Sequence, residues 1–482
     1  MKRLLLGAVM GLFALNSFGQ KEFGYKVEVT FKQPIKDKKV YLAHYFGKGL
    51  PTIYKLDSAV VENGGTKAVF QKKDSILGGL HLVMFDNYSR FFHLLLDNGY
   101  TIRVETDTLG RAHFFENKIN QDFEEEEHKL VALQKPKDKW RKAYDNAKTK
   151  SDSSKAEKQY QALLQQEKDL KRAYAASHPG NLLTLIFNAM DSPDLPKKKH
   201  FLPNGKEDTM YTARYYKDHY WEKFDFTDNR LIKTGLLDNR LNEYFSNLVY
   251  PIPDSINYEM DKMLAKAESA KEIYKYILHW LGNWTVNSKM MGVDASFVYL
   301  VENYYGKGKA FWLDSAAIAK YQERAEQIAP NVLGNKAPKL VMQDISTLKD
   351  VEITEATHSP YTVLVFWSIT CGHCMTEMPK IAEMYRTDLK KMGVEVISVP
   401  VTVDGGNDIR KVYDEWKVTD DWITLVDLKN TREYLHLYDA YSTPVIYVLD
   451  KDKIIVGKKL AASSIIPIIE YDMEHKNRKK KN

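Results

Sequence analysis

Cysteine is nearly absent from this sequence, which has only two, Cys371 and Cys374, in 482 residues. This excludes a fold held together by many disulfides, because such a framework needs several cysteine pairs spread along the chain. A structural zinc site needs four ligands, but there is no second CxxC motif, and the two closest histidines, His81 and His93, are twelve positions apart. We therefore expect no metal.

A second absence is an apolar run long enough to span a membrane, which takes about 20 residues. A signal peptide has a basic start, a shorter apolar run and small residues before the cleavage site. The first residues show these parts in order, as Lys2 and Arg3, Leu4–Leu15, and Ser17 and Gly19. We expect residues 1–19 to be a signal peptide, so that the protein is exported and its mature form has no membrane span. Without a cysteine near this segment, no lipid anchor is expected there.

The excess of positive charge is confined to the two ends of the chain. Of the net charge of +6, two units come from Lys2 and Arg3 and five from residues 476–482, which leaves −1 for the rest. Nucleic acid is therefore not an expected partner. Residues 473–482 have no apolar face, so we expect a basic, disordered tail rather than a membrane-surface or partner-binding patch.

Residues 20–108 alternate apolar and polar side chains in short runs. Examples are YKVEVTF and GLHLVMF, and polar or glycine-rich breaks such as ENGG and DNGY separate the runs. This pattern predicts an antiparallel β domain, a sandwich or an open barrel. The order and spacing resemble the small β domain that precedes thioredoxin-like modules in many exported Bacteroidetes proteins.

Residues 109–330 change to the helical period. For example, one face of residues 155–176 collects Ala156, Tyr160, Leu163, Leu170 and Tyr174. We expect an all-α middle domain, similar to the helical domain that often lies between the β domain and the thioredoxin-like module in the same bacterial group. Its aromatic cluster, Tyr215, Tyr216, Tyr220 and Trp221, either lines a peptide groove or packs in the core, and core packing is the commoner use of such residues.

From residue 331 onwards, strand and helix patterns alternate, which predicts a third domain, residues 331–472, with a sheet covered by helices. Both cysteines lie in the stretch VLVFWSITCGHCMTEMPK, which begins at Val363. VLVFW suits a buried strand, SIT suits a turn, and the residues that follow have apolar side chains at helical spacing. Cys371 then lies at a helix N-terminus, where free N–H groups and the helix dipole stabilise a thiolate.

Three uses of this cysteine pair other than metal binding remain. A structural disulfide that closes a four-residue loop adds only about 2 kcal/mol. Buried, inert thiols do not fit an exported protein, because adjacent thiols are readily oxidised outside the cytosol. Catalysis explains more of the pattern: Cys371 is the nucleophile, Cys374 is the more buried resolving thiol, and protonated His373 stabilises the thiolate.

Four segments carry a resemblance to known proteins. They are GNKAP (334–338), FWSITCGHCMTEMP (366–379), STP (442–444) and VIYVLDKD (445–452). Through them the third domain resembles the thioredoxin fold, and in particular the exported thiol-disulfide proteins related to the cytochrome c maturation reductases. The resemblance implies that Pro444 is cis and faces the cysteines, that the backbone at Thr443 and Pro444 pairs with an extended substrate, and that Trp367 helps to tune the thiolate. It implies no cofactor.

The sequence departs from this pattern at two places. Classical thioredoxins and disulfide isomerases have a buried acid six residues before the first cysteine, where Val365 stands here. Asp404, in VTVDGG, is a candidate proton acceptor in its place, although an aspartate in DGG is more often an exposed turn residue. His373 makes the motif CGHC, as in disulfide isomerases. Their reduction potential is near −180 mV, against about −270 mV for thioredoxin, and this difference corresponds to about 4 kcal/mol.

The sequence thus predicts a multidomain, periplasmic thiol-disulfide oxidoreductase that acts on protein disulfides. Net reduction is favoured, with a membrane thiol carrier as the electron donor. The alternatives are a disulfide isomerase or oxidase, and a binding protein in which the thioredoxin-like module is a scaffold. A peroxidase is less favoured, because peroxiredoxins have a Pro-x-x-x-Thr-x-x-Cys loop, whereas Ser368 takes the threonine position here and no such proline is present.

Overall fold

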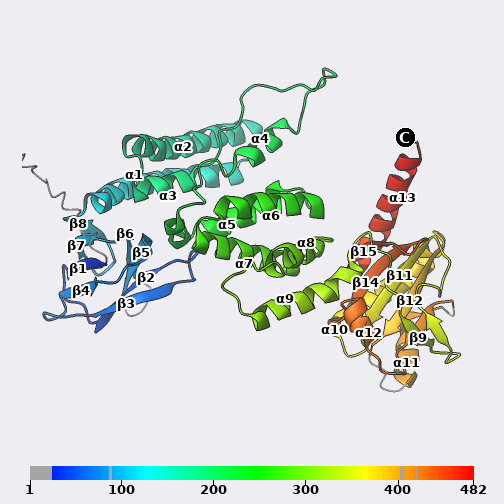
Figure 1. The fold of residues 1–482 in the computed structure, drawn as a ribbon. Coiled ribbons are helices and arrows are strands. Elements are labelled where there is room, and N and C mark those ends of the chain that lie inside the picture. Colours follow the sequence, from blue (N-terminus) through cyan, green and yellow to red (C-terminus); the bar gives the residue numbers. More distant parts are fainter. Residues whose placement is uncertain (1–23, 86–89, 402–405, 420, 482) are drawn as a thin grey trace, which may run out of the picture. The chain divides into compact units, whose positions relative to one another are not determined.

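The computed structural model describes residues 24–85, 90–401, 406–419 and 421–481 (Figure 1). The chain divides into two compact units, with the division between Leu241 and Asn242. The expected signal peptide lies outside the described residues. Among the helices that are described, none is long and apolar enough to cross a membrane.

The first unit begins with eight strands in two four-stranded sheets, ordered β4-β1-β7-β8 and β3-β2-β5-β6. The strands are β1 (Tyr25–Phe31), β2 (Lys39–His44), β3 (Tyr54–Val60), β4 (Lys67–Lys72), β5 (Gly79–Phe85), β6 (Phe91–Leu96), β7 (Tyr100–Thr106) and β8 (Ala112–Phe114). The predicted β domain is confirmed, but one detail differs. The pair β1–β7 is parallel, whereas the other described strand pairs of the two sheets are antiparallel.

The two sheets form a sandwich because alternate side chains of each strand point into a shared core. In β1, Tyr25, Val27, Val29 and Phe31 are buried while the residues between them are more exposed. Phe31 contacts Phe85 of the other sheet, with ring centroids 5.8 Å apart. The period-two pattern of the sequence therefore corresponds to the inner faces of the sandwich.

Helices follow the sandwich. Those of the first unit are α1 (Lys118–Asp145), α2 (Lys150–Ser177), α3 (Leu182–Met190) and α4 (Tyr211–His219), and α5 (Leu237–Glu243) crosses the division. Thr149 caps α2, because its side-chain oxygen accepts a hydrogen bond from the Asp152 N–H at 3.1 Å. The second unit continues with α6 (Pro253–Ala267), α7 (Lys271–Asn287), α8 (Asp294–Leu300) and α9 (Ser315–Ile328). The helical middle region is thus confirmed, and its helices are shared between the two units.

The second unit ends in a seven-stranded sheet of order β10-β9-β13-β12-β11-β14-β15. Its elements are β9 (Val341–Asp344), β10 (Asp350–Glu352), β11 (Tyr361–Trp367), α10 (Gly372–Met384), β12 (Val394–Pro400), α11 (Gly406–Trp416), β13 (Ile423–Val426), α12 (Glu433–Leu437), β14 (Val445–Asp450), β15 (Ile455–Lys458) and α13 (Ile465–Lys481). Strand β11 is buried along its whole length, parallel to β12 and antiparallel to β14. This is the predicted thioredoxin-like α/β fold.

Alternate side chains of β11 enter two different cores. Val363, Val365 and Trp367 pack with apolar residues of α10, α11 and α13. Leu364 and Phe366 point the other way and pack with α12. The sheet therefore has helices on both faces, which explains why the sequence of β11 is a continuous apolar run.

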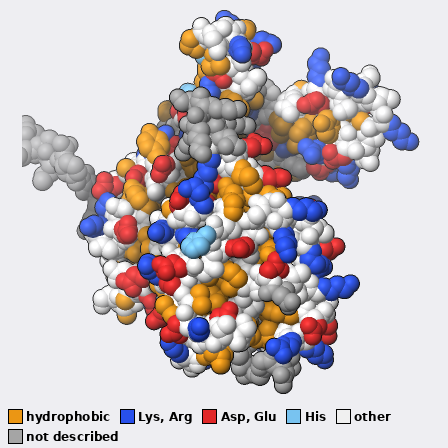
Figure 2. Space-filling model, turned by 90° about the vertical axis from the view of Figure 1, so that its right-hand side faces the viewer, with side chains coloured by type: hydrophobic (Ala, Val, Ile, Leu, Met, Phe, Trp, Pro, Cys, Tyr) orange, Lys and Arg blue, Asp and Glu red, His pale blue; other side chains and the backbone are white. Residues whose placement is uncertain are grey.

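The C-terminal end differs from the prediction. Helix α13 continues to Lys481, so most of the tail that we expected to be disordered is helical. The face shown in Figure 2 carries basic and acidic side chains interspersed over the described surface. This mixture agrees with the near-neutral charge of the chain without its two ends.

Candidate active site

The two cysteines lie where the central strand passes into its helix. Strand β11 ends at Trp367, a turn follows, and Cys371 is the N-cap residue of α10. The sulfur of Cys371 accepts a hydrogen bond from the Cys374 N–H at 3.4 Å. Cys371 is partly exposed, Cys374 is fully buried, and the two thiols are not bonded to each other. As expected, Cys371 therefore lies at the start of the helix and Cys374 lies one turn inside it.

The surroundings of the two thiols shift their pKa values in opposite directions. Burial raises the pKa of Cys374 to about 11, although the Ser368 N–H, 3.4 Å from the sulfur, acts against this rise. Burial also acts to raise the pKa of Cys371, but hydrogen bonds outweigh it, and the pKa of Cys371 is lowered. These hydrogen bonds come from Cys374, the Thr443 side chain and the main-chain N–H of His373. Cys371 therefore has the larger thiolate fraction of the two near neutral pH.

The loop before β14 faces Cys371. The peptide bond Thr443–Pro444 is cis, as the resemblance implied. The thiol of Cys371 donates a hydrogen bond to the Thr443 carbonyl oxygen at 3.1 Å. Val445, the next residue, pairs with Phe366 in the sheet, so the register of β14 against β11 brings the loop to the cysteines.

His373 is exposed beside the two cysteines. Its main-chain N–H helps to lower the pKa of Cys371, and its side chain helps to lower the pKa of Glu377. The larger causes at Glu377 are Lys380, whose Nζ lies 2.6 Å away, and the Ala462 N–H at 2.8 Å. The sequence analysis did not single out Glu377, although its position in the EMP segment, one turn after Cys374, was visible.

Trp367 lies in the core next to the dithiol segment and is fully buried. Its indole N–H donates to the Ser398 hydroxyl at 2.7 Å, and that hydroxyl also bonds the Tyr413 hydroxyl at 2.7 Å.

Val365 is fully buried and pairs with Ser398 across β11 and β12. The position of the usual buried acid is therefore apolar, and Asp404, the candidate replacement, lies outside the described residues.

No group of three or more histidine, cysteine or acidic side chains among the described residues is arranged to hold a metal ion. Two of the cavities among the described residues lie in the middle region. A cavity of about 530 Å³ is mostly apolar and is lined by residues of α7, α8 and α9, including Phe297 and Tyr321. Neither cavity includes a cysteine in its lining.

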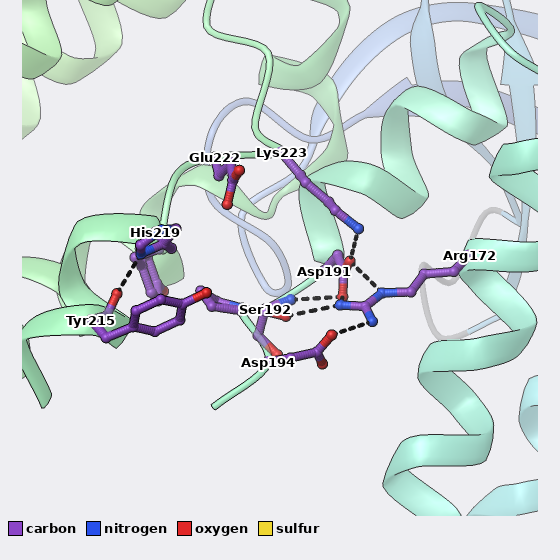
Figure 3. A pocket seen from close by; sticks show the side chains of 10 residues that line it. Arg172, Asp191, Ser192, Asp194, Tyr215, His219, Glu222 and Lys223 are labelled. Atoms are coloured by element: carbon purple, nitrogen blue, oxygen red, sulfur yellow. Dashed lines mark hydrogen bonds and ion pairs between the residues drawn. The ribbon is translucent and has the colours of Figure 1, made fainter. Parts of the chain in front are cut away.

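The second cavity, of about 230 Å³, lies between α2 and α4 (Figure 3). Its buried carboxylate, Asp191, accepts hydrogen bonds from Arg172 at 2.8 Å and from Lys223 at 2.6 Å, and Arg172 also binds Asp194. These charges pair with one another, so the network has a clear structural role. Of the predicted aromatic cluster, Tyr220 and Trp221 are buried, while Tyr215 lines the cavity.

Comparisons with known proteins agree with the fold of the last segment. Residues 333–458 match the AhpC/TSA family, and residues 188–331 match a domain of unknown function, DUF5106. No curated protein matches this chain.

Solved structures that resemble the chain include three bacterial proteins. A thioredoxin-like protein from Bacteroides caccae is 20% identical, with a TM-score of 0.47, over 59% of this chain and 98% of its own. A domain of a possible thiol-disulfide isomerase from Cytophaga hutchinsonii is 32% identical over 31% of this chain and 99% of its own, with a TM-score of 0.27. The thioredoxin domain of a thiol-disulfide oxidoreductase from Bacteroides vulgatus is 22% identical over 29% of this chain and 97% of its own, with a TM-score of 0.26.

Proposed function

We propose that this protein is a periplasmic thiol-disulfide oxidoreductase that reduces disulfides of other proteins and needs no cofactor. The observation that carries the proposal is the position of Cys371. Its partly exposed sulfur caps α10 and lies 3.1 Å from the carbonyl oxygen of Thr443, beside the cis bond to Pro444. Cys374, with its raised pKa, lies behind it.

In the first step, the thiolate of Cys371 attacks one sulfur of a substrate disulfide. A bond forms between that sulfur and Cys371, the substrate disulfide breaks, and the other substrate sulfur leaves as a thiolate that takes up a proton. The backbone around Thr443 and Pro444 holds the extended substrate during this attack. The lowered pKa of Cys371 favours this step because it increases the thiolate fraction.

In the second step, Cys374 loses its proton and attacks the sulfur of Cys371. The mixed disulfide breaks, the second substrate sulfur leaves as a thiolate, and the enzyme now carries the Cys371–Cys374 disulfide. Two electrons have passed from the enzyme to the substrate. A second turnover requires a thiol donor, and in the periplasm we propose a membrane thiol carrier for this role.

The direction of electron flow follows from several opposing effects. Protonated His373 beside the thiolate stabilises the reduced enzyme and therefore makes its disulfide a stronger oxidant. We favour net reduction because the FWxxxCxxCxxEMP segment is close to the exported reductases. The residues between the cysteines are one influence among several, and the buried Val365 and the position on the helix also set the potential.

The activity is tested by reduction of insulin disulfides with the full chain and two serine variants. We expect Cys371→Ser to abolish turnover and Cys374→Ser to accumulate a mixed disulfide with the substrate, because its resolving thiol is missing. A mixed disulfide through Cys374 in the Cys371→Ser variant would reverse the assigned roles. Unchanged function of both variants in the cell would support the binding-protein alternative instead.

The direction is tested in cells that are quenched in acid and treated with a thiol-specific mass tag. A reductase should shift from dithiol to disulfide when the membrane thiol carrier is deleted, because nothing then returns its electrons. An unchanged redox state of Cys371 and Cys374 after that deletion would contradict net reduction and favour an oxidase or isomerase.

A further inference from the structure

A buried carboxylate lies just before the loop that faces Cys371. Asp439 is four residues before Thr443, is 5% exposed, and has a left-handed backbone conformation with φ of 48°. Its two oxygens accept hydrogen bonds from both terminal nitrogens of Arg324 at 2.5 and 2.9 Å. Arg324 lies on α9, 115 positions earlier in the chain. The middle helices therefore contact the thioredoxin-like fold close to its reactive loop.

A second contact attaches the same segment to the residues that follow α9. Asn331, fully buried after the end of α9, donates through its side-chain amide to the carbonyl oxygen of Leu437 at 3.1 Å. Its side-chain oxygen accepts a hydrogen bond from Lys458 of β15 at 2.7 Å. The segment between Leu437 and Asp439 is thus attached to α9 and to the turn that follows it.

Few residues separate these anchors from the cis bond, and the first of them, Ala440, is buried in the core. Tyr438 is fully buried, and its carbonyl oxygen accepts a hydrogen bond from Tyr447 at 2.6 Å. Tyr441 and Ser442 are exposed. The Tyr441 hydroxyl bonds the ring Nδ1 of His436 at 2.9 Å, and Thr443 then contacts Cys371. Asp439 is thus the residue at which α9 holds the segment that leads to the reactive loop.

We propose that Arg324 is a positioning residue of the dithiol site. Through Asp439 it fixes the segment that presents Thr443 and Pro444 to Cys371 and to the protein substrate. This inference rests on the proposed function, because it assigns to the middle helices a part in substrate binding. Arginine suits this role because its planar guanidinium binds both carboxylate oxygens at once and so fixes direction as well as distance.

Asp439 has a second cationic partner besides Arg324. Lys459 donates a hydrogen bond to it at 2.7 Å, so the carboxylate keeps one cationic partner when Arg324 is replaced. Loss of Arg324 then removes the two-point contact with α9 without leaving the buried charge unpaired. The expected consequence is a displaced or more mobile loop rather than a failure to fold.

The experiment compares Arg324→Ala and Arg324→Lys with a control, Lys320→Ala, in the full chain. Lys320 is exposed on the same helix, one turn before Arg324. We expect Arg324→Ala to lower kcat/KM for insulin about tenfold, mainly through KM, and Arg324→Lys to lower it less, because lysine keeps one contact. The rate with a small aromatic disulfide should stay within twofold, because that substrate does not need the loop backbone.

Hydrogen exchange provides a readout that does not depend on activity. Backbone amides of residues 440–446 should exchange about tenfold faster in Arg324→Ala than in wild type or Lys320→Ala, while those of α10 should not change. Unchanged exchange, or an equal loss of rate with insulin and with the small disulfide, would overturn the positioning role. If the wild type reduces neither disulfide, the proposed function fails, and the exchange measurement still decides the role of Arg324.

Discussion

At neutral pH, an alkylating reagent should react with Cys371 much faster than with Cys374. The pKa of Cys374 is about 11, and that of Cys371 lies below the ordinary value of 9.0. At pH 7 the thiolate fraction of Cys374 is then about one in ten thousand, and that of Cys371 exceeds about one in a hundred. The structure therefore predicts at least about a hundredfold difference in rate, to which the complete burial of Cys374 adds.

The assay follows iodoacetamide labelling of the reduced native protein by peptide mass spectrometry from pH 5 to 9. Two matched variants, Cys374→Ser and Cys374→Ala, test the cause of the shift. The side chain of Cys374 donates to Cys371 and lowers its pKa, and serine keeps a donor whereas alanine does not. Loss of this hydrogen bond should therefore make the pKa of Cys371 higher in the alanine variant than in the serine variant.

Two results would refute this reasoning. Labelling of Cys374 before Cys371, or at a comparable rate, would show that the roles of the thiols are wrong. Equal pH midpoints in the serine and alanine variants would show that the hydrogen bond from position 374 does not stabilise the thiolate.

Three further predictions concern other parts of the molecule. Asp294→Ala should lower the free energy of unfolding by about 3–5 kcal/mol in denaturant melts, because Lys458, with a 1% exposed side chain, loses its ion partner at 2.7 Å. The control is the exposed pair of Lys451 and Asp452, where Asp452→Ala should change the free energy of unfolding by less than about 0.5 kcal/mol. Burial lowers the pKa of His93 to about 4, so His93 binds a proton more readily in the unfolded chain than in the folded one. The melting temperature of the β sandwich should therefore fall as the pH drops from about 6.5 toward 4, and it should fall less in His93→Gln. Thr443→Val should raise the pKa of Cys371, seen as a higher midpoint in the labelling profile, because the Thr443 side chain lowers that pKa; an unchanged midpoint would contradict this.

Much of the fold could be predicted because it depends on local periodicity. Apolar and polar residues alternate in β1 because only one face of that strand is buried. Strand β11 is a continuous apolar run because both of its faces are buried. The cap position of Cys371 follows from the change between a strand pattern and a helix pattern within a few residues. The resemblance of the STP segment predicted the cis bond before Pro444, and the structure confirms this bond.

Local patterns failed where a partner far along the chain decides the outcome. The parallel pairing of β1 with β7 joins Tyr25 to Tyr100, and nothing in either strand distinguishes parallel from antiparallel neighbours. The basic tail had no apolar face by itself, yet α13 begins in apolar residues packed on the sheet, and its helix extends into that tail.

The sequence by itself therefore determined the dithiol arrangement on which the proposed chemistry rests, because a helix-capping cysteine with a second cysteine one turn later is a local arrangement. Only the tertiary structure decided how that chemistry is supported. Arg324 and Asp439 look like ordinary surface charges in the sequence, and they meet only because the end of α9 packs against the segment before β14. Contacts between single residues more than a hundred positions apart leave no periodic signal, so the part of the middle helices in the site became visible only in the folded chain.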